Sequence, residues 1–253
     1  MSTETLQPHL PWIESHSPLP SVENAWGKGT DAPGLLAAGS DLGVERLLEA
    51  YAMGVFPWYN PDQPVLWWSP DPRMVLQVKK FKLHRSLRKT LMRYAAHPHF
   101  ELSFDRAFDD VIEACARSPR EGQNGTWIVP AMVQAYKDLH RAGFAHSAET
   151  WLDGELVAGL YFVCIGKAVF GESMFSTLSD GSKMALAALV HVCKQHEIQT
   201  IDCQQKTAHL ASMGAEEMSR SAFLDHSLPA LKLDSPDWKN AQIDWDAWRR
   251  AST

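Results

Sequence analysis

The segment 200–204 carries the pair of side chains best suited to chemistry. Asp202 and Gln204 are two residues apart, so on a strand they would share one face, while Ile201 and Cys203 would point into the layer behind. A carboxylate beside a carboxamide can fix which end of the amide is presented. The amide oxygen can then accept a hydrogen bond or a proton from an incoming amine. The alternative interpretation is structural, with Asp202 capping the next helix and Gln204 exposed.

A second polar group lies in segment 171–175, which otherwise suits burial. Glu172 in this segment could be a buried group with a binding role, or it could lie in water at the edge of a sheet. The sequence GESMF is only partly similar to the nucleophile elbow of hydrolases, because Phe175 stands where a second glycine is required. We therefore do not expect a serine hydrolase.

A basic block extends from residue 72 to residue 100. These 29 residues contain no Asp or Glu and hold eight of the 24 Lys and Arg residues, which leaves 16 basic against 30 acidic residues elsewhere. The net charge of −6 therefore hides a local excess of positive charge, which favours a site for a polyanion. The alternative is a solvated helix face.

Aromatic side chains gather in loop-like segments near this block. Trp58, Trp67, Trp68 and Trp127 are examples. Flat side chains beside cations can stack on the bases of single-stranded nucleic acid. Several of the ten tryptophans must instead pack in a core or between domains.

Composition and missing motifs exclude several classes of protein. The chain is 45% hydrophobic and 21% charged, and its longest apolar run, 156–165, is about half of what a membrane-spanning helix needs. The first twelve residues lack the basic and apolar regions of a secretory signal, so we expect a soluble, cytoplasmic protein. Cysteine spacing predicts neither a disulfide framework nor a zinc knuckle, and His191 and His196 do not share a helical face. We expect no metal site.

The elements that must position these residues alternate between helices and strands. Periodicity predicts strands at 74–78, 100–104, 146–152, 155–165, 168–175 and 200–203. It predicts helices at 84–94, 107–117, 130–142 and 182–196, and a short helix that ends at Gly214. This order predicts an α/β (α+β) fold with a mixed sheet flanked by helices.

The N-terminal part is predicted to form a separate small domain. It begins with a Pro-rich arm, and Asp41 is a plausible cap for an amphipathic helix that starts near Val44 and ends at Gly54. Four prolines in segment 59–73 indicate a boundary. We therefore expect a small N-terminal domain over residues 1–71 and a second domain with a C-terminal tail over residues 72–253.

Taken together, these segments resemble the leucyl/phenylalanyl-tRNA–protein transferases. The matching stretches include GLLAAGSDL, FPW, WWSPDPR, TWI, FGESMFS and IDCQ, in this order, and the resemblance extends from residue 34 to about residue 224. It implies a small N-terminal domain joined to a GNAT acetyltransferase-like domain. It also implies an enzyme that moves Leu, Phe or, less readily, Met from charged tRNA to the N-terminal Arg or Lys of a protein, which marks that protein for degradation by the N-end rule pathway. No metal or organic cofactor is implied, and we expect a monomer.

The resemblance also implies roles for particular residues. Asp202 would orient Gln204, which would assist the attacking α-amine. The terminal adenosine of the tRNA would be held by Trp58 and Trp127. The donor amino acid would occupy a pocket formed by Leu160, Glu172, Met174 and Ile201. The tRNA acceptor arm would contact Arg85, Arg88 and Lys89.

The residues alone leave some questions open. Either Asp202 or Glu172 could face the cationic acceptor residue, and Gln204 could take the proton or only orient the amine. An N-acetyltransferase that uses CoA would share the fold, but its Q/R-x-x-G-x-G/A pyrophosphate loop is missing. A non-catalytic RNA-binding module would need only the basic block and the aromatic side chains.

Overall fold

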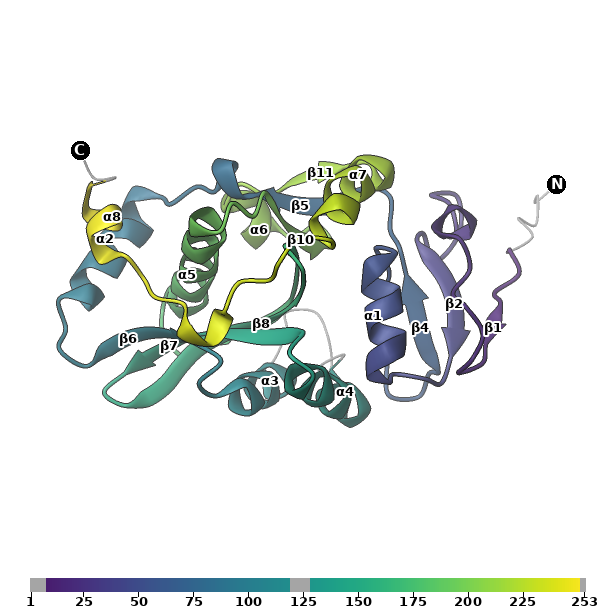
Figure 1. The fold of residues 1–253 in the computed structure, drawn as a ribbon, viewed down its shortest axis with the longest axis horizontal. Helices are drawn as coiled ribbons and strands as arrows, with labels where there is room; N and C mark the ends of the chain where they lie inside the picture. The colour runs from purple at the N-terminus through teal and green to yellow at the C-terminus, as the bar shows by residue number, and fades with distance from the viewer. Residues whose placement is uncertain (1–7, 119–127, 251–253) are drawn as a thin grey trace.

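The computed structural model describes residues 8–118 and 128–250, which form two sheets and the helices around them (Figure 1). The smaller sheet has four strands in the order β1 (Trp12–Ile13), β2 (Leu35–Gly39), β4 (Val65–Trp68) and β3 (Phe56–Pro57). Helix α1 (Val44–Ala52) lies between this sheet and the rest of the molecule in Figure 1. None of these four strands was predicted: β1, β3 and β4 have only two, two and four residues, and all five residues of β2 are buried, so its sequence shows no alternation.

The start of α1 differs from the prediction. Gly43, not Asp41, is the N-cap residue, and the Asp41 Oδ1 atom accepts the Gly43 backbone N–H at 2.8 Å. Asp41 therefore forms a turn just before the helix, so its prediction as the cap was wrong.

One side chain of α1 holds the Pro-rich arm. Arg46 is 4% exposed, and its Nη2 atom donates to the backbone carbonyls of Glu14, Ser15 and Ser17 at 3.0, 3.0 and 2.6 Å. A guanidinium that satisfies several carbonyls fixes an irregular segment that has few backbone partners of its own. The arm is thus bound to the surface of the small domain.

The larger sheet has seven strands and is mixed. Its order is β11 (Glu216–Met218), β5 (Arg73–Gln77), β10 (Thr200–Gln204), β9 (Ala168–Ser176), β8 (Glu155–Ile165), β7 (Ala145–Leu152) and β6 (Phe100–Phe104). Strands β9 and β10 are parallel, and the other neighbouring pairs of this sheet are antiparallel. Six of these strands agree closely with the periodicity of the sequence, whereas β11 was not predicted.

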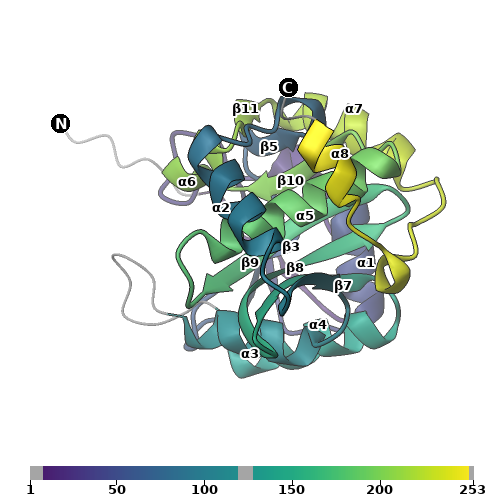
Figure 2. The ribbon, with the colours of Figure 1, turned by 90° about the vertical axis from the view of Figure 1, so that its left-hand side faces the viewer.

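Helices cover both faces of the larger sheet (Figures 1 and 2). The helices are α2 (Arg85–Ala95) and α5 (Gly181–Gln195) on one face and α3 (Phe108–Arg117) and α4 (Pro130–Arg141) on the other. Three more helices follow in the chain: α6 (Ala208–Ser212), α7 (Arg220–Ala230) and α8 (Trp245–Arg250). Short 3-10 turns occur at Val22–Asn24, Val78–Lys80 and Trp238–Asn240. The predicted α/β class, with a mixed sheet flanked by helices, is confirmed.

The hydrophobic core has two clusters, one on each face of the larger sheet. One cluster unites residues of α1, α3 and α4 with the small sheet, and the other contains the buried faces of α2 and α5. The rings of Tyr51 on α1 and Phe170 on β9 lie 5.0 Å apart, so the small domain shares a core with the larger sheet. The boundary between residues 71 and 72 falls in the connection between the two sheets and stays a prediction.

Candidate active site

The predicted catalytic strand lies where two parallel strands separate. Ile201 pairs with Val169 and Asp202 pairs with Phe170, and beyond these pairs β9 follows β8 while β10 follows β5. A side-chain hydrogen bond joins the two strands beyond this point, because Gln204 Nε2 donates to Glu172 Oε1 at 2.8 Å. The structure thus brings together the two polar segments that the sequence analysis treated separately.

Strands β9 and β10 each contain a β-bulge, and these bulges set the directions of the Glu172 and Gln204 side chains. On β9 the register passes from Ser173 opposite Tyr161 to Gly171 opposite Phe162, so Glu172 is the extra residue. Bulges bend a strand and are frequent next to active sites.

The bulge on β10 places Gln204 in an unusual backbone conformation. The register passes from Asp202 opposite Val75 to Gln204 opposite Met74, and Gln204 has φ = 60°. A non-glycine residue in this left-handed region is uncommon and costs free energy, so it occurs where the surroundings enforce it. Simple alternation along a strand could not predict this geometry.

Asp202 is held by a buried arginine. Arg73 on β5 donates from Nε to Asp202 Oδ1 at 2.8 Å and from Nη2 to Oδ2 at 2.5 Å, and the two residues are 0% and 1% exposed. The guanidinium carbon lies 4.8 and 4.9 Å from the ring centroids of Phe56 and Phe223. This two-bond ion pair between aromatic rings fixes the carboxylate in one orientation.

Asp202 reaches Gln204 through the backbone. Its Oδ1 atom accepts the Gln204 backbone N–H at 2.8 Å, whereas the carboxamide of Gln204 donates to Glu172. The alternative interpretation of this strand was wrong on two points. Thr207, not Asp202, caps the next helix, and Gln204 is only 8% exposed.

Glu172 lies in a triangle of oxygen atoms with two tyrosines. The hydroxyl of Tyr51 on α1 lies 2.6 Å from Oε1, the hydroxyl of Tyr136 on α4 lies 3.2 Å from Oε2, and the two hydroxyls lie 2.5 Å apart. Glu172 is partly exposed, whereas both tyrosines are almost fully buried. Sequence periodicity places both tyrosines in the core, and the signal that was missed is that a buried phenol needs a hydrogen-bond partner.

Burial changes the acidity of this triangle. Removal from water raises the pKa of Glu172 to about 7, the negative charge of Asp202 also raises it, and hydrogen bonds from Tyr51, Gln204 and Tyr136 oppose the shift. Burial and the nearby Glu172 charge raise the pKa of both tyrosines. Glu172 is therefore poised to gain or lose a proton near neutral pH.

The predicted donor pocket is divided between the two faces of the sheet. Leu160 and Ile201 are 3% and 1% exposed and belong to the cluster around α5, against which Met174 also packs. Glu172 instead contacts tyrosines of α1 and α4 on the opposite face. The structure does not gather these four residues into one wall.

The predicted stacking residues are described only in part. Trp58 is partly buried and forms an edge contact with Trp68, whose Nε1 donates to the Trp58 carbonyl at 2.6 Å. Trp127 lies outside the described residues. Trp67 and Trp238 are 0% and 1% exposed, so these two pack in the core.

The predicted tRNA-binding residues on α2 differ in exposure. Arg85 and Lys89 are exposed, whereas Arg88 is partly buried and lines a pocket of about 450 Å³ with Lys194 of α5 and Trp248. The buried Nη2 atom of Arg88 has no acceptor in the described part of the chain. Arg85 and Lys89 therefore suit contact with a polyanion better than Arg88 does.

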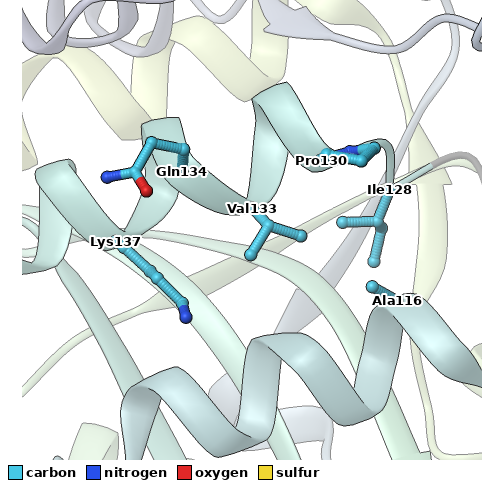
Figure 3. A pocket seen from close by; sticks show the side chains of 6 residues that line it. All are labelled: Ala116, Ile128, Pro130, Val133, Gln134 and Lys137. Carbon is cyan, nitrogen blue, oxygen red and sulfur yellow. The ribbon is translucent and has the colours of Figure 1, made fainter.

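Figure 3 shows a second pocket, of about 410 Å³, between α3 and α4. It is lined by Ala116, Ile128, Pro130, Val133, Gln134 and Lys137. The Lys137 ammonium lies 2.6 Å from Glu113 and 3.5 Å from Asp109. These two carboxylates neutralise Lys137, which is the one charged residue among the described residues that line the pocket. None of the predicted site residues that the structure describes lines this pocket.

Asp105, His140 and His146 form a group whose donor atoms could hold a metal ion, since those atoms lie within 4.8 Å of one another. Protein partners already account for each side chain. His146 Nδ1 lies 2.7 Å from Asp105, Asp105 also accepts the Ser147 N–H, and His140 Nδ1 lies 2.7 Å from a backbone carbonyl. These contacts join the turn after β6 to β7 and α4.

Comparison with known proteins assigns the chain to a family. The family model described as leucyl/phenylalanyl-tRNA protein transferase matches residues 75–227, and the model of that family's N-terminal domain matches residues 40–71. A leucyl/phenylalanyl-tRNA–protein transferase of Polaromonas sp. is 56% identical over 93% of this chain and 92% of its own length. The protein of the same name from Albidiferax ferrireducens is 54% identical over 94% of both chains.

Solved structures give weaker matches. A functionally unknown conserved protein of Staphylococcus epidermidis has a TM-score of 0.36 at 8% identity, over 73% of this chain and 68% of its own. A structure titled L-PGS from Bacillus licheniformis has a TM-score of 0.36 at 11% identity, over 72% of this chain and 55% of its own. These scores are too low to carry an argument.

The mixed α/β fold, the buried polar site and the sequence relatives together define an enzyme of the transferase class. The chain belongs to the leucyl/phenylalanyl-tRNA–protein transferase family.

Proposed function

We propose that the protein moves leucine, phenylalanine and, less readily, methionine from charged tRNA to the α-amine of proteins that begin with Arg or Lys. The product would be marked for degradation by the N-end rule pathway. The observation that carries this proposal is the Gln204–Glu172 hydrogen bond between separated strands, in a chain more than half identical to a relative named leucyl/phenylalanyl-tRNA–protein transferase.

The proposed chemistry is aminolysis of an ester. This reaction is downhill, so holding the donor ester and the amine in attack geometry can supply most of the acceleration. Gln204 suits this task because its Nε2 is engaged by Glu172, which leaves the carboxamide oxygen to accept a hydrogen bond from the amine. Asp202 would support Gln204 by fixing its backbone.

Of the two carboxylates considered for the acceptor, Glu172 is the better placed. Asp202 is almost fully buried and already paired with Arg73, so it has no capacity for a second cation. Glu172 is partly exposed and hydrogen-bonded to Gln204. We therefore infer that the N-terminal residue of the acceptor lies beside Glu172.

Other residues would bind the tRNA. Trp58 and Trp127 would hold the terminal adenosine, and Arg85 and Lys89, with a smaller part for Arg88, would contact the acceptor arm. Leu160, Met174 and Ile201 would line an apolar pocket for the donor side chain, on the α5 side of the sheet. Because Glu172 lies on the other face, its proposed role is toward the acceptor and not the donor.

The mixed sheet with helices on both faces supports the GNAT acetyltransferase-like assignment of residues 72–253. No helix among the described residues is long and apolar enough to cross a membrane. We propose that the protein acts as a monomer in the cytoplasm without a metal or an organic cofactor.

The test is a transfer assay with radiolabelled leucine on tRNA and two peptides that differ only in an N-terminal arginine or alanine. Label on the arginine peptide alone would support three parts of the proposal: leucine on tRNA as the donor, an N-terminal arginine as the acceptor, and transfer of the amino acid as the reaction. Label on neither peptide, with tRNA binding intact, would overturn the proposal and favour an RNA-binding module.

A further inference from the structure

The buried ion pair at Asp202 raises the question of where the proton of the attacking amine goes. Both Asp202 oxygens accept bonds from Arg73, and one of them also accepts the Gln204 backbone N–H. Asp202 is also only 1% exposed, so a carboxylate whose two oxygens are already engaged by Arg73 is poorly placed to meet the amine. Gln204 is a neutral amide and a very weak base. The proton therefore needs another acceptor close to both.

The oxygen triangle around Glu172 has room for one more proton. Glu172, Tyr51 and Tyr136 make three oxygen–oxygen contacts, of 2.5, 2.6 and 3.2 Å, and each contact needs one proton to be a hydrogen bond. With Glu172 ionised, the two hydroxyls supply only two protons. With Glu172 protonated, there are three protons for three contacts, so the neutral acid is satisfied without any change of position.

Glu172 is held from three elements and stays partly exposed. The tyrosines hold it from α1 and α4, while the Gln204 carboxamide reaches it from β10, and the side chain stays partly exposed. An amine that hydrogen-bonds to the carboxamide oxygen of Gln204 would be brought close to Glu172, because the same carboxamide donates to Glu172.

We propose that Glu172 is the general base of the transfer, taking the proton from the attacking α-amine and returning it to the leaving ribose hydroxyl. This inference rests on the proposed function. The amine nitrogen forms a bond to the ester carbonyl carbon, and the carbonyl electron pair moves to its oxygen. The pair then returns, the carbon–oxygen bond to the ribose breaks, and the ribose oxygen takes the proton that the amine gave to Glu172. Atoms and charges balance, and Glu172 ends ionised as it began.

The acidity of Glu172 fits this role. A pKa of about 7 lets the group accept and release a proton at neutral pH, which is the condition for efficient general acid–base catalysis. The groups that face it are Tyr51 from α1, Tyr136 from α4, Gln204 from β10 and, at greater range, Asp202 with its partner Arg73.

The test compares Glu172→Gln with wild type in single-turnover transfer of leucine from Leu-tRNA to a peptide that begins with arginine. The rate is measured at several peptide concentrations and at pH values between 5.5 and 9. The amide keeps the size and an acceptor oxygen but cannot take a proton. We expect the transfer rate at saturating peptide to fall by about 10²–10⁴-fold, with tRNA affinity and thermal melting of the folded protein retained. The wild-type profile should contain two ionisations, those of the acceptor amine and of Glu172, and the variant only that of the amine.

A second measurement does not depend on the variant being active. In protein labelled with ¹³C at glutamate side chains, one carboxyl resonance should titrate near neutral pH and be absent from Glu172→Gln. Transfer by Glu172→Gln within about twofold of the wild-type rate, with an unchanged pH profile, would overturn this inference alone. Wild-type protein that transfers nothing would instead overturn the proposed function, even if the glutamate resonance titrates as expected.

Discussion

The two acidic side chains of the site differ because their neighbours differ. Asp202 is paired with a cation, since Arg73 binds it in two hydrogen bonds. Glu172 has hydroxyl and amide partners but no cation, so burial raises its pKa. One carboxylate thus fixes the backbone while the other stays able to exchange a proton.

Removal of Arg73 should be costly. Arg73→Met leaves Asp202 as a buried carboxylate without its cation, so we expect the free energy of unfolding in urea to fall by about 3–5 kcal/mol. The double variant Arg73→Met/Asp202→Asn should recover part of this loss, because neither charge remains. An Arg73→Met protein as stable as wild type would show that the ion pair contributes nothing to the fold.

Glu172 should make the protein less stable as pH rises. Its pKa is about 7 in the folded protein against 4.5 for the free side chain, so the folded state binds more protons between these values and stability falls through this window. Above pH 7 the cost is on the order of 3 kcal/mol at most. We therefore expect Glu172→Gln to be more stable than wild type at pH 8, with the difference shrinking toward pH 4.5, in urea titrations at several pH values.

The residues of the site could be predicted only in part from the sequence. Asp202, Gln204 and Glu172 were found because polar side chains stood out in strand-like segments. Tyr51 lies 121 residues from Glu172, and Arg73 lies 129 residues from Asp202. Helix periodicity places Tyr51 in the core, and charge counting places Arg73 in the basic block, so neither pattern reveals a partner so far away in the chain.

At the scale of elements, two bulges on neighbouring strands set the site. Strand and helix bounds followed from apolar periodicity to within a few residues. The bulges did not, because one inserted residue changes the register without changing the composition. The strands of the small sheet were missed for other reasons: β3 and β4 are too short to show a period, and all five residues of β2 are buried, so its sequence does not alternate.

Helix α2 carries a testable difference within the basic block. Arg85 and Lys89 are exposed, so replacing either with alanine should weaken tRNA binding. A plot of log affinity against log salt concentration should also become less steep, by roughly 0.7–0.9 in slope for each phosphate that is no longer neutralised. Arg88→Ala should change the slope less, because its side chain is partly buried against α5.

Filter binding at several salt concentrations would measure these slopes. Arg141→Ala provides a matched control, since Arg141 is an exposed cation on α4 that pairs with Asp138. Equal slope changes for Arg88 and Arg141 variants, with none for Arg85 and Lys89, would contradict the assignment of this surface.

The whole molecule behaves as one packed body, although it contains two sheets. Tyr51 of the small domain completes the triangle at Glu172 and packs on Phe170, and Arg73 donates to the Gly54 carbonyl at 3.2 Å. The small domain therefore supplies part of the site and part of the core around it.

This shared core predicts cooperative unfolding. We expect a single transition in calorimetry of the full chain, because separating the small domain would expose Phe170 and leave Glu172 without one tyrosine. Two well-separated transitions would indicate that the domains are stable independently. Tyr51→Phe, which keeps the packing and removes one hydroxyl, should preserve the single transition.

The extra residue on β9 also sets the phase of that strand. Before Glu172 the even-numbered Phe170 faces the cluster of α1, α3 and α4, whereas after it the odd-numbered Phe175 does so. Deleting one residue here would turn one half of the strand over and exchange its buried faces. The strand should therefore tolerate replacement of Glu172 but not its deletion, and relatives that keep this fold should keep the length of this segment even where its letters change.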